Sequence, residues 1–381
     1  MPSLPDPTGP HAIGTLTRHW IDRDRRDIFR GPDAGPRELM VQAWYPTDAG
    51  APGPTAPYVD DARTLEQLAL LMGLPQAAFA GLAWLPTHAL RDAPIAAGGP
   101  YPVLLFSHGR CGVREHNTFQ VEDLASHGYV VLAIDHPGAA SGVRFPDGRL
   151  APFDPRLLPP WPRHGPTDPE AAFLDAVIPF LVEDVRFVLH RLAALDEDRR
   201  EPLAGRLDLD RVGILGVSLG GMVAASACAS EPGFAALLTM DAAVPWDTVA
   251  AGLRLPVMWM SRPAATMRRE GWSEADVSDV HDSMRATFEG LPGSGYIVLV
   301  PGMYHVDFSD GRLLSPLMAE RGICGPIAGA LARGIVRAWS LAFFDRHLNG
   351  LPAALLDEPS GMQPHLSFER RTAARWTPVG V

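Results

Sequence analysis

Short, nearly continuous apolar runs recur along the chain and alternate with longer stretches of helical periodicity. The short runs lack the strict polar alternation of a strand that has one face in water, so they are predicted to be strands buried on both faces. An early strand at residues 37–45 is expected to pair with residues 13–20. The further predicted strands are residues 102–106, 129–134, 212–217, 235–240, 257–260 and 297–300.

Helical patterns fill the intervals between these strands. Helices are predicted at residues 118–127, 180–195, 219–230 and 327–348. Alternation of strand and helix is typical of a mostly parallel sheet with right-handed crossovers. The sequence therefore predicts an α/β fold, a central sheet flanked by helices, formed by residues 1–381 as a single domain.

Two segments interrupt the alternation. Residues 58–90 carry a helical apolar pattern before the first central strand, and residues 142–167 are rich in proline and arginine. The second segment is too long to be an ordinary connecting loop. Either both are surface excursions, or they cap the carboxyl ends of the strands, where ligands bind in sheets of this type. We expect them to form a cap or lid.

Composition narrows the classes of function. The chain is 46% hydrophobic and 20% charged, as expected of a packed protein, and its net charge of −11 argues against nucleic-acid binding. All 33 basic residues are arginine, and lysine is absent. Schiff-base enzymes, pyridoxal-phosphate enzymes, Walker-type phosphate loops and Ser–Lys dyads are thereby excluded, because each needs an amine.

Neither a metal nor a cofactor is expected. The three cysteines are unpatterned, and no H-E-x-x-H spacing is present. No apolar run reaches the roughly 18 residues of a transmembrane helix. The protein is expected to be cytoplasmic if the 381 residues are the full-length chain, and secreted if a signal peptide was removed.

The strongest local motif is G-V-S-L-G-G at residues 216–221, centred on Ser218. The G-x-S-x-G pattern alone is common, but here it follows a predicted strand and opens a predicted helix. That context is typical of a serine held on a strained strand–turn–helix elbow with its hydroxyl exposed above the sheet. A serine that merely caps a helix would not need glycine on both sides. Ser218 is therefore the candidate nucleophile.

A serine hydroxyl needs a base, and the base needs an orienting acid. In the order Ser…Asp…His, both follow the elbow at the ends of later strands. Asp241 ends one predicted strand and His305 follows another, so they are predicted to be the acid and the base.

Three rival residues fit less well. Asp247 lies farther from its strand end than Asp241 does. His281 belongs to a polar, helical segment and is expected to be a solvated surface residue. His136 precedes the serine and is expected to lie in a loop or to line the pocket.

Two backbone amides should bind the oxyanion of the tetrahedral intermediate. One is expected from Leu219, which follows the nucleophile, and the other from the loop after the first central strand. In that loop the amide of Arg110 is the candidate, because Gly109 allows a tight turn. The Arg110 guanidinium either lies near the pocket or faces solvent.

These motifs resemble the platelet-activating factor acetylhydrolase group of α/β-hydrolases and, more broadly, many bacterial esterases. The similarity rests on FSHGR with Arg114, GVSLGG, TMDAAVPW and GMYHVDFSD, and it extends to RELMVQAWYPT and FFDRHLNG. It implies a Ser218–His305–Asp241 triad, an oxyanion hole from Leu219 and Arg110, and metal-independent hydrolysis of short or oxidised acyl esters. Cys111 departs from the pattern, which has glycine at that position.

We therefore expect a serine hydrolase of the α/β-hydrolase fold that cleaves carboxylic esters, short-acyl or lipid-like, through an acyl-enzyme. The expected partner is a small-molecule ester or lipid substrate, with no nucleic acid and no transmembrane segment, and the oligomeric state is left open. An acyltransferase or cyclase, or a polyester or lactone hydrolase, would use the same triad. A catalytically silent binding protein is the alternative of another class.

Overall fold

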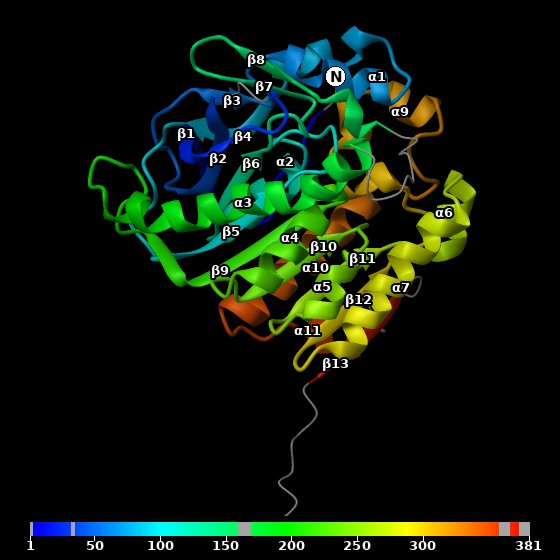
Figure 1. The fold of residues 1–381 in the computed structure, drawn as a ribbon. Coiled ribbons are helices and arrows are strands. Elements are labelled where there is room, and N and C mark those ends of the chain that lie inside the picture. The colour runs from blue at the N-terminus through cyan, green and yellow to red at the C-terminus, as the bar shows by residue number, and fades with distance from the viewer. Residues whose placement is uncertain (1–2, 32–34, 159–168, 358–365, 373–381) are drawn as a thin grey trace, which may run out of the picture.

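The computed structural model describes residues 3–31, 35–158, 169–357 and 366–372, and its main feature is one large twisted sheet (Figure 1). In the described part of the chain this sheet has 11 strands in the order β13-β12-β11-β10-β9-β5-β6-β2-β1-β4-β3. A separate two-stranded hairpin, β7 and β8, completes the strands described.

Six neighbouring strands run parallel and form the centre of the sheet. They are β6 (Val130–Asp135), β5 (Tyr101–Ser107), β9 (Leu207–Val217), β10 (Ala236–Met240), β11 (Val257–Ser261) and β12 (Gly295–Leu299). Their side chains are almost all buried, as expected for strands covered on both faces. The predicted parallel core is confirmed, with boundaries that differ by one or two residues except at β9, which starts earlier.

The two edges of the sheet are less regular. On one side lie β2 (Pro36–Thr47), β1 (Ala12–Arg26), β4 (Pro86–Arg91) and β3 (Thr55–Pro57), and at the other edge lies β13 (Ser367–Arg371). β1 and β2 pair, as the sequence predicts; this pairing is antiparallel, and so are the β2–β6, β3–β4 and β12–β13 pairings. Both ends of the chain thus add antiparallel strands to a parallel centre.

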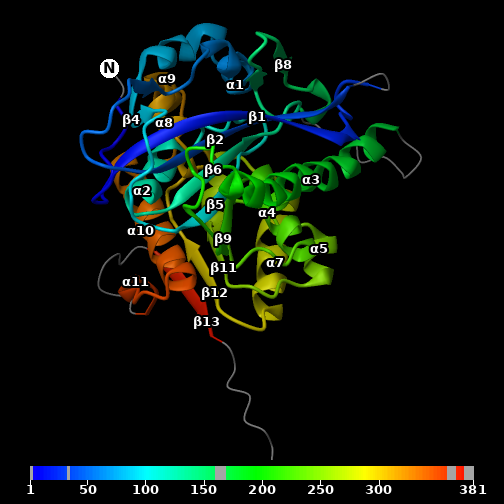
Figure 2. The ribbon, with the colours of Figure 1, turned by 90° about the vertical axis from the view of Figure 1, so that its left-hand side faces the viewer.

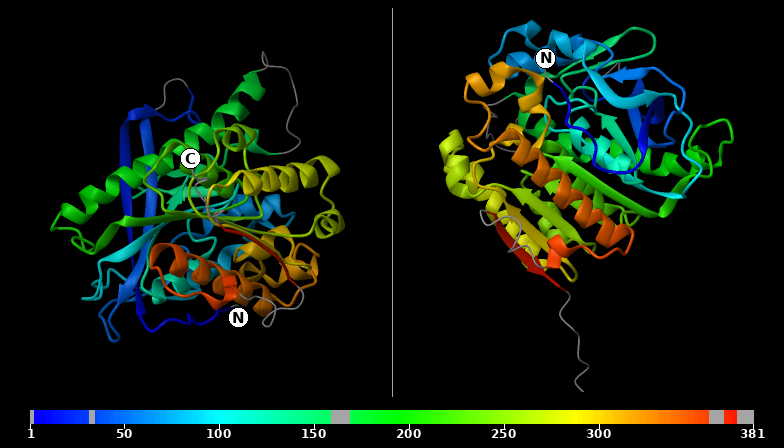
Figure 3. Two further views of the ribbon diagram at one scale, coloured as in Figure 1. Left: turned by 90° about the horizontal axis from the view of Figure 1, so that it is seen from below. Right: turned by 180° about the vertical axis from the view of Figure 1, so that it is seen from behind.

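Helices cover both faces of the sheet (Figures 2 and 3). On one face lie α3 (Pro169–Glu197), α4 (Leu219–Ser230), α5 (Trp246–Ala251) and α7 (Glu274–Gly290). On the other lie α2 (Thr118–Ser126), α10 (Gly329–Leu348) and α11 (Ala354–Asp357). The shorter elements are α6 (Ala264–Glu270), α8 (Gly311–Leu314), α9 (Pro316–Glu320) and the 3-10 turn η4 (His305–Phe308). Two apolar clusters, one on each side of the sheet, form the core.

The two predicted excursions lie beside one another. The first holds η1 (Ala62–Leu65), α1 (Glu66–Leu71) and η2 (Gln76–Trp84), but its last residues belong to β4 of the main sheet. The second holds the hairpin of β7 (Gly142–Arg144) and β8 (Leu150–Pro152), followed by η3 (Pro155–Leu157), while residues 159–167 lie outside the described residues. The amide of Leu68 donates to Ser141 Oγ over 2.9 Å and joins the two. Their role as a cap stays a prediction.

Among the helices of the described ranges, none is long and apolar enough to cross a bilayer.

Candidate active site

Ser218 lies on a strained turn between β9 and α4. Its backbone φ is +55°, a conformation that non-glycine residues rarely adopt. The turn is possible because its neighbours are glycines: a methyl group at Gly216 would overlap the Gly220 carbonyl, and one at Gly220 would overlap the Ser107 carbonyl. The local sequence therefore produces the strained serine elbow that the motif predicts, with Ser218 partly exposed.

Asp241 lies beside this elbow because neighbouring strands end in register. Val217 and Met240 are paired residues at the ends of β9 and β10, and Ser218 and Asp241 each follow directly. The Ser218 amide donates to the Met240 carbonyl over 2.9 Å. Asp241 also has a positive φ, +46°, so both side chains leave the sheet at sharp turns. The carboxyl edge of the parallel strands thus gathers the polar groups.

His305 reaches Asp241 from the turn after β12. Its Nδ1–H donates to Asp241 Oδ2 over 2.6 Å, and its side chain is 28% exposed. Burial would raise the pKa of Asp241, but the charge of Arg262 and the hydrogen bond with His305 outweigh it and lower that pKa to about 2. Asp241 is therefore ionised at neutral pH and fixes the orientation of the imidazole.

The Ser218 hydroxyl makes no side-chain hydrogen bond within the described ranges, so the structure joins His305 to Asp241 but not yet to Ser218. Catalytic hydrogen bonds are often long without substrate and tighten when it binds. The contact between the candidate base and acid is thus formed, and the candidate nucleophile lies at the same strand edge.

A buried arginine supports the acid, and the sequence analysis missed it. Arg262, directly after β11, donates Nε–H to Asp241 Oδ1 over 3.0 Å, and its Nη2 lies 2.9 Å from Oδ2. Its other nitrogen pairs with Glu270, whose carboxylate also accepts the His305 amide. Trp272 packs against both Arg262 and the His305 ring. The strand-end rule that selected Asp241 would have found Arg262 as well.

The two candidate oxyanion amides lie on either side of the elbow, and their role stays a prediction. Leu219 is the first residue of α4, so its N–H has no acceptor within the helix. Arg110 lies in the loop after β5, where a methyl group on Gly109 would be 3.2 Å from Ser218 Cβ. Burial lowers the pKa of the Arg110 guanidinium, which is therefore not fully solvent-facing. Cys111 has φ +59°, which explains why glycine suits this position.

The three rival residues are not part of this arrangement. Asp247 is exposed in the first turn of α5, where its carboxylate accepts the Thr248 amide over 2.6 Å. The expectation of a solvated His281 is wrong: the side chain is half-buried on α7 near Arg262, and burial lowers its pKa. His136 follows β6 as predicted but is fully buried and lines neither of the cavities described next.

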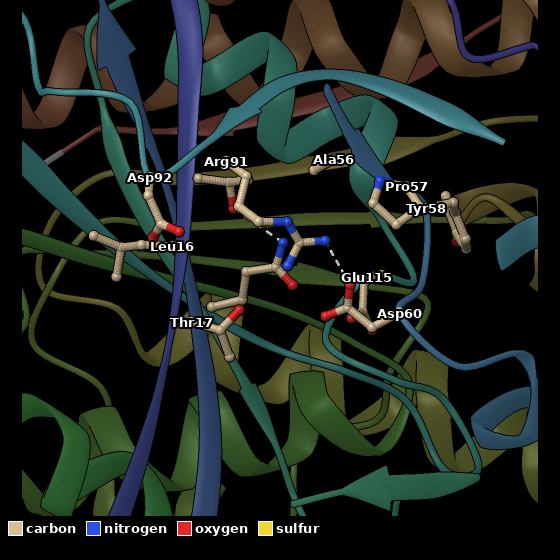
Figure 4. A pocket seen from close by; sticks show the side chains of 11 residues that line it. Leu16, Thr17, Ala56, Pro57, Tyr58, Asp60, Arg91, Asp92 and Glu115 are labelled. Atoms are coloured by element: carbon tan, nitrogen blue, oxygen red, sulfur yellow. Dashed lines mark hydrogen bonds and ion pairs between the residues drawn. The ribbon is translucent and has the colours of Figure 1, made fainter. Parts of the chain in front are cut away.

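Two cavities lie away from the candidate triad. One, of about 140 Å³, is enclosed by β1, β3, the end of β4 and Glu115, and an Arg91–Asp60 ion pair crosses it (Figure 4). A neighbouring cavity of about 250 Å³ includes Arg114 and Arg144. Neither is lined by Ser218, Asp241 or His305. In the described residues, no group of three or more His, Cys, Asp or Glu side chains could hold a metal ion.

Asp310, on the loop that follows His305, is a buried carboxyl that ties three segments together. It accepts hydrogen bonds from the Tyr58 hydroxyl over 2.9 Å and from the amides of Thr118 and Phe119 over 2.6 and 3.3 Å. Burial raises its pKa to about 8 in spite of these bonds. The loop carrying the base is thus attached to the root of residues 58–90 and to the start of α2.

This raised pKa predicts a pH-dependent stability. Between about pH 4 and pH 8 the folded protein keeps a proton on Asp310 that the unfolded chain releases, so stability falls as pH rises through this range. The slope from this one group is up to about 1.4 kcal/mol per pH unit. Urea unfolding from pH 5 to 8.5 should show a smaller fall for Asp310→Asn than for wild type. Parallel profiles would contradict the assignment.

The chain is similar to esterases over most of its length. The family described as platelet-activating factor acetylhydrolase, isoform II, matches residues 3–144, and the alpha/beta hydrolase fold family matches residues 102–270. Platelet-activating factor acetylhydrolase of Canis lupus familiaris is 26% identical over 164 residues, 40% of this chain and 37% of that protein. The chain therefore aligns with less than two thirds of that relative.

Two longer matches agree. A probable 1-alkyl-2-acetylglycerophosphocholine esterase of Arthroderma benhamiae is 24% identical, over 96% of this chain and 93% of the relative. The structure of a ferulic acid esterase from Streptomyces cinnamoneus is 30% identical, with a TM-score of 0.72, over 96% of this chain and 99% of that chain. With a central parallel sheet, an elbow serine and a bonded Asp–His pair, the chain belongs to the α/β-hydrolase superfamily and is similar to its platelet-activating factor acetylhydrolase-like esterases.

Proposed function

We propose that the protein hydrolyses carboxylic esters with Ser218 as nucleophile, His305 as general base and acid, and Asp241 as the group that orients His305. The observation that carries this proposal is the 2.6 Å bond between His305 Nδ1 and Asp241 Oδ2 at the strand edge where Ser218 occupies its strained elbow. This bond leaves Nε2 as the ring nitrogen that can accept a proton.

The reaction proceeds in two halves. In the first, Ser218 Oγ attacks the ester carbonyl carbon while His305 Nε2 takes the hydroxyl proton, and the tetrahedral intermediate collapses as the alcohol leaves with that proton. In the second, His305 activates a water that attacks the acyl-enzyme, and Ser218 regains its proton as the acid departs. Ionised Asp241 stabilises the imidazolium formed in each half.

The amides of Leu219 and Arg110 are proposed to bind the oxyanion. Both belong to backbone that is already fixed, one by a helix start and the other by packing of its loop against the elbow. Donors held in place before reaction need no reorganisation when charge develops on the carbonyl oxygen. This pre-formed pair of donors would stabilise the transition state more than it stabilises the bound ester.

The proposed substrates are short-acyl or lipid-like esters. The names of the relatives point to acetyl esters of glycerophospholipids and to esters of ferulic acid, both of which are carboxylic esters of small acids. His305 is partly exposed and lies against the Trp272 ring, so an apolar surface adjoins the base. Aromatic and aliphatic surfaces beside a few polar groups are typical of small-molecule sites.

Labelling with a fluorophosphonate tests the proposal. We expect one label per chain, and peptide mapping should place it on Ser218, with no label on heat-unfolded protein. Ser107 serves as an internal comparison, because it is a serine with a histidine neighbour but is fully buried. A label on Ser107, or no label on the native protein, would contradict the assignment of the nucleophile.

Turnover should be measured on p-nitrophenyl esters of increasing chain length beside a short-acyl phospholipid. We expect the acetyl and other short esters to be cleaved with release of the free acid. Adding an alcohol acceptor distinguishes hydrolysis from acyl transfer, because a transferase would divert most of the acyl group to the alcohol.

A further inference from the structure

A second Ser–His–Asp arrangement lies inside the protein. Ser107 Oγ is 3.0 Å from His136 Nε2, and His136 Nδ1 is 3.0 Å from Asp184 Oδ2. The atoms follow the same order as in the proposed triad, but Ser107 and Asp184 have 0% exposure and His136 has 1%. No substrate can reach this serine, so the arrangement needs another explanation than catalysis.

Asp184 anchors the inner end of this arrangement from helix α3. Arg37 of β2 donates to both of its carboxylate oxygens, over 3.0 and 2.6 Å, and Arg25 of β1 donates over 2.8 Å. Burial would raise the pKa of Asp184, but the charge of Arg37 and the hydrogen bond with His136 hold it below its usual range. An ionised carboxylate with three partners from three elements fixes the His136 ring firmly.

The outer end reaches the loop that carries Arg110. Ser107 is the last residue of β5, and the His136 amide donates to His108 Nε2 over 3.1 Å. Since Nε2 accepts this bond, the proton of His108 is on Nδ1, which donates to the Gly109 carbonyl over 2.7 Å. Burial lowers the pKa of His108 well below its usual value, which keeps this tautomer neutral. The buried Ser107–His136–Asp184 arrangement is therefore connected to Gly109 through hydrogen bonds made by His108.

The same loop is also paired with the segment that follows His136. The Cys111 amide donates to the Ala139 carbonyl, and the Ser141 amide donates to the Gly112 carbonyl, each over 2.8 Å. On its other side the loop touches the elbow, where even a methyl group on Gly220 would overlap the Ser107 carbonyl. A loop held on both sides has little freedom to move relative to Ser218.

We propose that Ser107, His136 and Asp184 are positioning residues that hold loop 108–112, and with it the Arg110 amide, at the oxyanion position beside Ser218. The inference rests on the proposed function, since it takes Arg110 to be an oxyanion donor. Donors must lie within a few tenths of an ångström of their place to stabilise the transition state, so a loosened loop lowers kcat and leaves ester binding nearly unchanged.

The variants Ser107→Ala and His136→Phe test this role. Ser107→Ala removes one buried hydrogen bond and is expected to lower kcat for an acetyl ester roughly tenfold. His136→Phe removes both ring bonds and is expected to lower kcat by about 10²-fold. KM should change less than about twofold in both. His136→Gln retains an amide that can donate to Asp184 and should recover part of the loss.

The decisive readout compares an ester with the matching thionoester, in which sulfur replaces the carbonyl oxygen. Sulfur is a larger and weaker hydrogen-bond acceptor, so it gains little from the oxyanion amides. Displaced amides therefore reduce the ester rate more than the thionoester rate, and the ratio of the two rates should fall in the Ser107 and His136 variants. General loss of folded protein would lower both rates equally and leave the ratio unchanged.

Tyr129→Phe is the matched control. It removes a buried hydroxyl that donates to Asp345 over 2.7 Å, just before the start of β6, whereas His136 follows the other end of that strand. It should lower the melting temperature as Ser107→Ala does, with kcat and the ester-to-thionoester ratio equal to wild type.

The outcomes separate the two proposals. If wild type shows no turnover and no phosphonate label, the proposed function and this inference both fail. The wild-type protein is active in the second outcome. If the Ser107→Ala and His136→Phe proteins are folded and have the wild-type kcat and ester-to-thionoester ratio, only the positioning role is overturned. A reduced kcat with an unchanged ratio would also overturn it, since the loss would then come from elsewhere in the site.

Discussion

Replacing Ser218 with alanine is expected to lower kcat for an acetyl ester by about 10⁶-fold. The elbow presents a single hydroxyl at the strand edge beside the His305–Asp241 pair, and without it no acyl-enzyme forms. The residual rate would come from the oxyanion amides and from substrate binding alone. Burst kinetics should disappear, and mass spectrometry should no longer detect an acylated chain during turnover.

A serine on the same helix provides the control. Ser226 of α4 bonds to Thr248 over 2.8 Å, away from the elbow, so Ser226→Ala should retain wild-type kcat. Far-UV circular dichroism should be the same for both variants. A folded Ser218→Ala protein with ordinary turnover would show that another group is the nucleophile.

Asp241→Asn is expected to have two large effects, one on rate and one on stability. The amide cannot hold His305 in the tautomer that leaves Nε2 free, and kcat should fall by about 10⁴-fold. The change also removes the carboxylate facing the fully buried Arg262, which then keeps only Glu270. Removing one partner of a buried ion pair typically lowers the free energy of unfolding by about 3–5 kcal/mol. Kinetics and urea unfolding measure the two effects separately.

Asp247→Asn is the comparison for this variant, because Asp247 is exposed and close in sequence. It should change neither kcat nor the free energy of unfolding by more than a small amount. An Asp241→Asn protein as stable as wild type would contradict the role given to the Arg262 contact. An Asp241→Asn protein with wild-type kcat would show that Asp241 is not part of the triad.

Much of the fold follows from local patterns in the sequence. The central strands are apolar on both faces, and the helix after Ser218 is rich in small residues. The residue types along the chain therefore predict where both kinds of element lie. Strand order at the carboxyl edge then selects Asp241 and His305, because chemistry in such sheets collects where parallel strands end. The bond between these two residues agrees with that argument.

The groups that support the site could not be derived in the same way. Arg262 and Glu270 meet only when α6 folds back over the end of β11, and periodicity does not predict such a contact. Asp184 carries a signal that was available: with Leu181, Val185 and Val188 it lies on the buried face of α3, where a charge demands a partner. Its two arginine partners, however, come from strands more than a hundred residues earlier in the chain.

Tyr58 begins the segment of residues 58–90, and its bond to Asp310 attaches that segment to the same loop that carries His305. If residues 58–90 form the predicted cap, a substrate that displaces them would also pull on the loop through this bond and misalign the imidazole. Small acyl groups that enter without displacing Tyr58 would leave the imidazole aligned. The proposed esterase would then select its substrates by the size of the acyl group as well as by its chemistry.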